Sequence, residues 1–260
     1  MTLGVADRPR TPLEVDGQAL EMGSWAGEGT PLLLLHEGLG SVSMWRDFPG
    51  LLADVTRRPV VAWSRQGYGW SEPLPDARDP DYMHVEADRL PRLLDALGIE
   101  RAALFGHSDG GSIALLAAAR FPDRVEALIL EAPHIYVEQV TVDSIAAIRD
   151  VYQRSDLAER LGRHHRDADE VFWRWNNIWL EPRFRSWNIE ECLADIRAPA
   201  LLIQGLEDEY GTLEQLNRIE AMLDRVCRLE LTNCGHSPHR DQPAAVLEGV
   251  AAFLGELSPC

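Results

Sequence analysis

Short runs of consecutive apolar residues recur along the chain, and segments with helical spacing follow most of them. Unbroken apolar runs are typical of strands buried on both faces of a parallel sheet. We predict strands at residues 31–35, 59–63, 125–130, 199–204 and 228–231, and one more directly before Gly106. Helical spacing predicts helices at 44–53, 85–97 and 243–257 and after Ser108, with a hairpin over 13–22 that turns at Asp16-Gly17.

Alternation of strands and helices indicates an α/β fold, with a mostly parallel central sheet and helices on both faces. The interval 134–195 breaks this alternation, since it has no strand-like run and has helical segments at 142–161 and 171–180. An insertion of this length is more typical of a functional lid than of a loop. We therefore predict a core of residues 1–133 and 196–260 and an inserted helical cap of residues 134–195.

Composition narrows the location and the partners of the protein. At 260 residues with 45% hydrophobic residues, the chain can bury one large core. It has no apolar run of about 18 residues and no apolar signal-peptide segment at its beginning, so we expect a cytoplasmic protein without membrane contact. Its cysteines, Cys192, Cys227, Cys234 and Cys260, lack metal-site spacing and favour a reducing compartment.

The charged residues exclude several functions. A net charge of −17 disfavours nucleic acid and anionic membranes as partners, because both are bound through clustered positive charge. The chain contains no lysine, which excludes Schiff-base, pyridoxal-phosphate and P-loop chemistry. We expect a small-molecule substrate and a monomer or homodimer.

The sequence around Ser108 predicts a nucleophile. Gly106-His-Ser-Asp-Gly110 fits the G-x-S-x-G elbow, a strained strand-to-helix turn that needs residues without bulk around the serine. The helix that follows would favour negative charge at its first residues. The alternative is an ordinary turn in which Ser108 only caps a helix.

A serine nucleophile needs a base and an acid that orients the base. His236 follows the last predicted strand and Asp208 follows the preceding one, so both would lie at the carboxyl edge of the sheet with Ser108. Glu207 and Glu209, which flank Asp208, and Glu131 are alternative acids, and a histidine after a strand is often only a surface residue.

An oxyanion hole needs two backbone donors. We predict the N–H of Asp109, directly after the nucleophile, and that of Gly38, with Leu39 next, in the loop after the strand at 31–35. We expect His36, Glu37 and Leu39 of this loop to contact substrate. A simple glycine turn is the alternative for this loop.

With these motifs, the chain resembles the capped α/β-hydrolase superfamily over nearly its whole length. The segments that carry the resemblance are His36-Glu-Gly-Leu-Gly40, Arg65-Gln-Gly-Tyr-Gly-Trp-Ser71, the elbow, Asp208 and His236. Residues 106–115, 132–137 and 148–150 look like the valacyclovir hydrolase (biphenyl hydrolase-like) branch. The resemblance implies hydrolysis of a small carboxylic ester through an acyl-enzyme, without cofactor or metal.

The resemblance also implies a role for Asp109, because an acidic residue at this position in that branch recognises the amino group of an amino-acid ester. A residue that merely suits a helix N-terminus is the alternative. The chain departs from the family at His36-Glu37, where His-Gly is usual. Trp173, Trp175 and Trp179 of the insertion are candidate walls of an apolar substrate pocket, with packing between lid and core as the alternative.

Other activities use the same serine, histidine and aspartate. Carbon–carbon bond hydrolases, enol-lactonases and acyl-CoA thioesterases stay open as alternatives. From another class, the chain would be a non-catalytic receptor for a small ligand that retains the fold.

Overall fold

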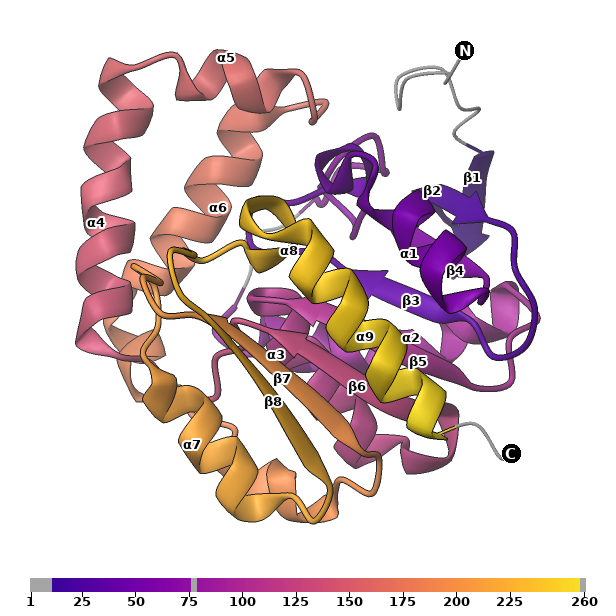
Figure 1. Ribbon diagram of the computed structural model, residues 1–260. Helices are drawn as coiled ribbons and strands as arrows, with labels where there is room; N and C mark the ends of the chain where they lie inside the picture. The colour runs from indigo at the N-terminus through magenta and orange to yellow at the C-terminus, as the bar shows by residue number, and fades with distance from the viewer. Residues whose placement is uncertain (1–10, 76–78, 258–260) are drawn as a thin grey trace.

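The computed structural model describes residues 11–75 and 79–257. At its centre is an eight-stranded sheet in the order β1-β2-β4-β3-β5-β6-β7-β8 (Figure 1). Strand β2 runs antiparallel to both of its neighbours, and all the other pairs are parallel, which confirms the predicted sheet. The strands are β1 (Thr11–Val15), β2 (Gln18–Trp25), β3 (Leu32–Leu35), β4 (Val60–Trp63), β5 (Ala102–His107), β6 (Val125–Glu131), β7 (Ala200–Gly205) and β8 (Val226–Leu231).

The predicted hairpin is confirmed at β1 and β2. Val15 pairs with Gln18, so the turn consists of Asp16 and Gly17 alone. Both residues have positive φ, 54° and 76°, as the two-residue turn that matches the twist of paired strands requires.

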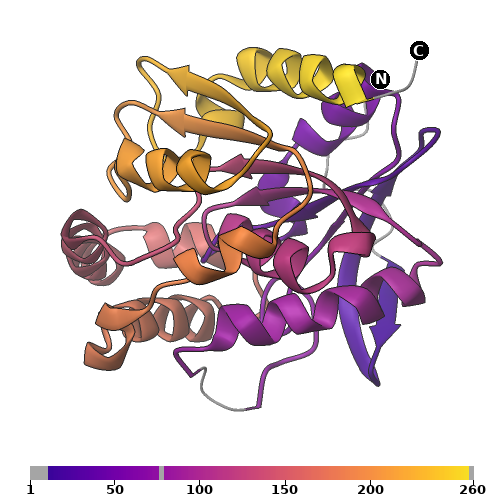
Figure 2. The same ribbon diagram turned by 90° about the horizontal axis from the view of Figure 1, so that it is seen from below.

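Helices cover both faces of the sheet (Figure 2). Helices α1 (Phe48–Thr56) and α9 (Pro243–Leu257) lie on one face, and α2 (Tyr82–Ala96), α3 (Asp109–Arg120) and α7 (Leu213–Met222) on the other. Leu32 and Leu34 pack with the first pair of helices, while Leu33 and Leu35 pack with the second group. This alternation explains the unbroken apolar run of β3, because each fully buried leucine contributes about 2 kcal/mol of hydrophobic free energy on one face or the other.

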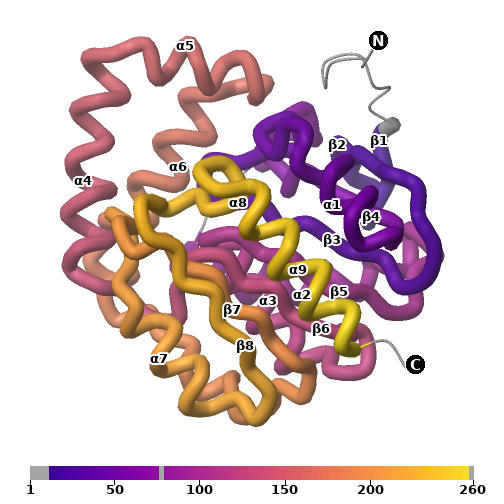
Figure 3. Tube along the Cα trace, in the orientation of Figure 1, coloured from indigo at the N-terminus to yellow at the C-terminus, as the bar shows by residue number. Residues whose placement is uncertain are grey.

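Between β6 and β7 the chain leaves the sheet and forms helices at its carboxyl edge (Figure 3). These are α4 (Gln139–Arg154), α5 (Leu157–Gly162) and α6 (Ala168–Leu180), followed by the 3-10 helices η4 (Pro182–Ser186) and η5 (Glu190–Asp195). The single helix predicted at 142–161 is wrong in one respect, since the helix breaks at Ser155. The Ser155 hydroxyl donates to Val151 O at 2.7 Å and accepts from Leu157 N at 3.2 Å, which replaces helical backbone bonds.

Short elements complete the chain: η2 (Val42–Trp45), η3 (Pro122–Arg124) and α8 (Pro238–Asp241). In the described ranges, no helix combines the length and the apolar composition needed to cross a membrane. Cys192, Cys227 and Cys234 are free thiols. The predictions for residues 1–10 and for Cys260 lie outside the described residues.

Candidate active site

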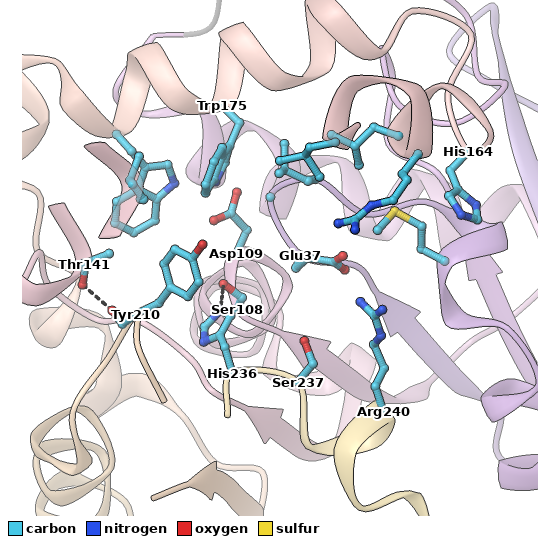
Figure 4. A pocket seen from close by; sticks show the side chains of 18 of the residues that line it. Glu37, Ser108, Asp109, Thr141, His164, Trp175, Tyr210, His236, Ser237 and Arg240 are labelled. Atoms are coloured by element: carbon cyan, nitrogen blue, oxygen red, sulfur yellow. Dashed lines mark hydrogen bonds between the residues drawn. The ribbon is translucent and has the colours of Figure 1, made fainter. Parts of the chain in front are cut away.

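The residues predicted for catalysis meet at the carboxyl edge of the sheet, where Figure 4 shows Ser108 beside His236. Ser108 lies between β5 and α3, Asp208 follows β7, and His236 follows β8. Because these strands are parallel and adjacent or nearly so, their carboxyl ends bring residues 128 positions apart into contact.

Ser108 has a strained backbone, with φ 53° and ψ −117°. The surrounding turn has no room for side chains: a Cβ on Gly106 would lie 2.3 Å from Gly110 O, and one on Gly110 would lie 2.0 Å from Leu35 O. Both glycines are therefore required by the close approach of β5, α3 and β3. Strain of this kind, of about 1–3 kcal/mol, is concentrated at functional sites.

A continuous hydrogen-bonded chain links the three side chains. The Ser108 hydroxyl lies 2.9 Å from His236 Nε2, and His236 Nδ1 lies 2.8 Å from Asp208 Oδ1 and 2.9 Å from Oδ2. With Nδ1 protonated and donating to the carboxylate, Nε2 is free to accept the serine proton.

Asp208 is held as an anion. Burial raises the pKa of its carboxyl, but the His236 ring and a hydrogen bond from it outweigh burial, and the pKa falls below its ordinary value. The Tyr210 N–H donates to Oδ1 at 2.8 Å and the Gln204 side-chain amide donates to Oδ2 at 2.6 Å. These bonds fix the carboxylate beneath the imidazole.

Glu131, an alternative acid, faces a different histidine. Its Oε1 accepts from both Nδ1 and the backbone N–H of His239, each at 2.8 Å, and the pair is buried. Burial raises the pKa of Glu131, and the charge of His239 and its hydrogen bonds lower it to a greater extent. Glu131 is thus already engaged, whereas Asp208 lies beside His236.

The loop after β3 is held from behind. The His36 ring is buried, its Nδ1 donates to Glu37 O at 2.7 Å, and its Nε2 accepts from Arg65 N at 3.1 Å. Burial, with the Arg65 charge, keeps the pKa of His36 well below 6.5, so the ring is neutral. Gly38 lies directly under Trp175, because a Cβ there would meet the indole Nε1 at 2.1 Å.

A cavity of about 510 Å³ opens above Ser108 and His236. Five of the residues predicted to contact substrate line this cavity: Glu37, Leu39, Asp109, Trp175 and Trp179. The structure does not bring the other two into it. His36 supports the loop from below, as described above, and Trp173 lines a separate hollow on the outer side of α6 with Arg174 and Asn177.

Asp109 is buried, although it lines the cavity. Its Oδ2 accepts a hydrogen bond of 2.6 Å from the Tyr82 hydroxyl, which comes from the beginning of α2. Burial and the Asp109 charge raise the pKa of Tyr82 well above 10, so it is a permanent donor here.

Several lining residues escaped the sequence analysis. They are His134, Thr141, Ile145 and Tyr210, and two arginines, Arg46 and Arg240. Tyr210 is two positions after Asp208, and its ring centroid is 4.8 Å from that of His236. Proximity to the predicted acid and base along the chain could have indicated Tyr210 and Arg240. Nothing in the local sequence marks the others.

His134 faces the base from the wall of the cavity, with its ring centroid 5.8 Å from that of His236. Burial, assisted by the His236 charge, lowers the pKa of His134 to about 4. A neutral ring at this position does not oppose the positive charge that a base acquires. Across residues 11–75 and 79–257, no three His, Cys, Asp or Glu side chains are grouped to hold a metal ion.

Comparison with known proteins gives one family and several relatives. Residues 30–188 match the family described as alpha/beta hydrolase fold, a range that includes Ser108 and ends before Asp208. The chain is 35% identical to serine hydrolase BPHL of Mus musculus over 138 residues, which is 52% of this chain. That alignment spans 46% of the mouse protein, so less than half of this relative is matched.

Two other matches extend over most of the chain. It is 25% identical to 2-hydroxy-6-oxo-2,4-heptadienoate hydrolase of Pseudomonas putida, with coverage of 88% of this chain and 90% of that protein. Among solved structures, a membrane phospholipase A is similar with a TM-score of 0.77 and 26% identity, covering 95% of this chain and 85% of that one.

Proposed function

This chain belongs to the α/β hydrolase fold family, and we propose that it is a serine hydrolase that cleaves a small carboxylic ester. The observation that carries this proposal is the hydrogen-bonded chain from Ser108 through His236 to Asp208 at the floor of the cavity. Serine hydrolase relatives within the family support it.

In the proposed reaction, Ser108 Oγ attacks the ester carbonyl carbon while His236 Nε2 takes the hydroxyl proton. Asp208 holds the ring in the required tautomer and stabilises the imidazolium. His236 then gives the proton to the leaving alcohol, which breaks the ester bond and leaves an acyl group on Ser108. Water, activated by the same histidine, releases the acid and restores the serine.

The N–H groups of Asp109 and Gly38 are the proposed oxyanion donors. Asp109 is the first residue of α3, where an N–H has no acceptor within the helix and the helix dipole favours negative charge. Gly38 also lines the cavity, beneath Trp175. Two such donors stabilise the tetrahedral intermediate more strongly than the planar ester.

Residues 134–195 are proposed to act as the lid over this site. Support comes from the side chains that they supply to the cavity: Thr141 and Ile145 from α4, and Trp175 and Trp179 from α6. This aromatic and aliphatic wall suits a modest apolar acyl group. Asp109 makes an amino-acid ester one candidate within this class.

A fluorophosphonate probe, which reacts only with an activated serine, tests the proposal. The native protein is expected to be labelled and to hydrolyse 4-nitrophenyl esters, and Ser108→Ala is expected to lose both. Ser237→Ala is the matched control, since Ser237 lines the same cavity next to His236 and is expected to keep its labelling. A native protein that binds ligands but neither reacts nor hydrolyses would be a receptor.

A carbon–carbon bond hydrolase is the second candidate. The observation in its favour is the Pseudomonas putida relative, named for a 2-hydroxy-6-oxo-dienoate, which matches over nearly the whole of both chains. Turnover of 2-hydroxy-6-oxo-2,4-heptadienoate at a higher kcat/KM than any ester of equal size would favour this activity over ester hydrolysis.

A further inference from the structure

The cavity has two chemically different sides, with the reactive serine between them. Figure 4 shows Thr141 and Tyr210 on one side of Ser108 and His236, and Arg240 and His164 on the opposite side. The first side is extended by aromatic and aliphatic side chains of the insertion. Arg240 belongs to the second side, and three further arginines, Arg46, Arg160 and Arg163, line the same cavity.

Contacts between distant segments bring these arginines together. The ring of Trp45 lies 4.8 Å from that of His239, so η2 and α8 pack against each other. Arg46 and Arg240 are the next residues along the chain after Trp45 and His239. On the other flank, the Ser43 hydroxyl lies 2.8 Å from His164 Nδ1, which joins η2 to the segment after α5 that carries Arg163. The basic side is therefore a property of the fold and not of one stretch of sequence.

Arg46 and Arg240 are available for a ligand. Of the ion pairs formed within the described residues, those at the cavity are Arg160 with Asp156 and Arg163 with Glu159, both exposed along α5 and its caps. None of the ion pairs between described residues involves Arg46 or Arg240. Salt bridges so exposed are weak and exchange readily.

The nearby acid Glu37 does not neutralise them, because it faces His107 at 3.6 Å. Burial lowers the pKa of His107, but Glu37 and Glu131 outweigh burial and raise it to about 9. The charge of Glu37 is thus balanced by a protonated histidine behind the cavity, which leaves the arginines in front of it uncompensated.

Arg46 is also held in an unfavourable backbone conformation, φ 53° and ψ −124°, close to that of Ser108. Any residue other than glycine is strained there, and such strain is retained mainly where a side chain must be aimed. The protein has a net charge of −17, so Arg46 and Arg240 create a region of positive potential in a mostly negative surface.

We propose that this arginine side is a subsite for an anionic group, such as a carboxylate, on the substrate. The inference rests on the proposed function and narrows it: the ester lies across Ser108, with its apolar part against the tryptophans and its anionic part between Arg46 and Arg240. Guanidinium groups recognise carboxylates through paired charge-assisted hydrogen bonds.

Two matched pairs of esters test the anionic subsite and determine whether the acyl half or the alcohol half of the substrate carries the anion. For the acyl half, mono-4-nitrophenyl glutarate is compared with the 4-nitrophenyl ester of glutaramic acid, which differs only in a neutral amide. For the alcohol half, 4-carboxyphenyl butyrate is compared with 4-carbamoylphenyl butyrate. Each pair is measured as a ratio of kcat/KM in the native protein, in Arg46→Gln/Arg240→Gln and in the control Arg154→Gln on the outer part of α4.

We expect the native protein to prefer the carboxylate in one pair, and the double variant to lower that ratio about tenfold. Arg154→Gln should leave the ratio unchanged, and salt should lower it in the native protein, a readout that needs no variant. Equal rates within both pairs, or a preference that survives in the double variant, would overturn the subsite while ester hydrolysis stands. Absence of both hydrolysis and fluorophosphonate labelling would overturn the proposed function as well.

Discussion

Gly110 decides whether the turn that carries Ser108 can close. A Cβ there would lie 2.0 Å from Leu35 O, a backbone atom of a central strand that cannot move aside. Gly110→Ala is expected to lower the free energy of unfolding by about 3 kcal/mol or more, measured by urea denaturation. Gly255→Ala is the matched control: Gly255 lies within α9 with nothing within 4 Å of a Cβ, so its replacement should stabilise the protein by about 0.5–1 kcal/mol.

At Asp109 the test concerns specificity. If its carboxylate recognises an amino group, Asp109→Asn should lower kcat/KM for an aminoacyl ester at least about tenfold more than for a neutral ester of equal size. The asparagine oxygen can still accept from Tyr82, which keeps the local hydrogen bond. Equal losses on both esters would limit Asp109 to its place at the start of α3.

At the scale of elements, His165 connects the helical insertion to two loops of the core. Its Nδ1 accepts from Gly69 N at 2.9 Å, and its Nε2 donates to Leu39 O, also at 2.9 Å, in the loop that contains Gly38. His165→Leu would leave both backbone groups unsatisfied. We expect a loss of about 2–4 kcal/mol of stability and a raised KM, by denaturation and steady-state kinetics.

His84→Leu is the control for this prediction, because His84 is a half-buried residue of α2 whose ring accepts an exposed hydrogen bond from Arg120 at 2.8 Å. Water can replace that bond, so the change should stay within about 0.5 kcal/mol. A His165 variant with native stability but a raised KM would indicate that the contact positions the loop without stabilising the fold. Native values of both would contradict the prediction.

The elements that sequence predicts best are those with local causes. A few neighbouring residues are enough to predict the apolar strand β3, the turn at Asp16-Gly17 and the glycine-flanked turn at Ser108. Helix α7 was not predicted, although Leu216 and Ile219 have helical spacing and are fully buried, because polar residues fill half of its ten positions and interrupt the apolar pattern. The break at Ser155 depends on a serine side chain that competes for backbone bonds, which apolar spacing does not report.

In the candidate site, too, the residues with local sequence signals were predicted and the others were not. Ser108, Asp208 and His236 were predicted from their order and from strand ends, and the structure brings them together. Arg46 and Arg240 were not predicted, since they lie far apart in the sequence and line the same cavity only in the folded chain, where Trp45 packs against His239. The prediction for Trp173 was wrong because Trp175 and Trp179, four positions apart, share the face of α6 that lines the cavity, whereas Trp173, two positions before Trp175, lies on another face.

For the whole molecule, buried histidines determine how stability depends on pH. Burial lowers the pKa of both His134 and His165 to about 4, below the value of about 6.5 in an unfolded chain. Between these values the unfolded state binds protons that the folded state does not, so the free energy of unfolding falls as the pH falls. Each histidine accounts for about 3 kcal/mol of this fall when complete.

His107 acts in the opposite direction, since its pKa of about 9 exceeds the unfolded value. Its stabilisation is complete below about pH 6.5 and is lost as the pH rises through 9. The two trends predict a maximum of stability near pH 6.5, measured by urea denaturation from pH 4 to 9. His107→Gln should abolish most of the loss of stability at alkaline pH and leave the loss at acid pH. The reason is that Glu37 then has no partner whose charge depends on pH. An unchanged loss of stability at alkaline pH in this variant would show that other groups cause it.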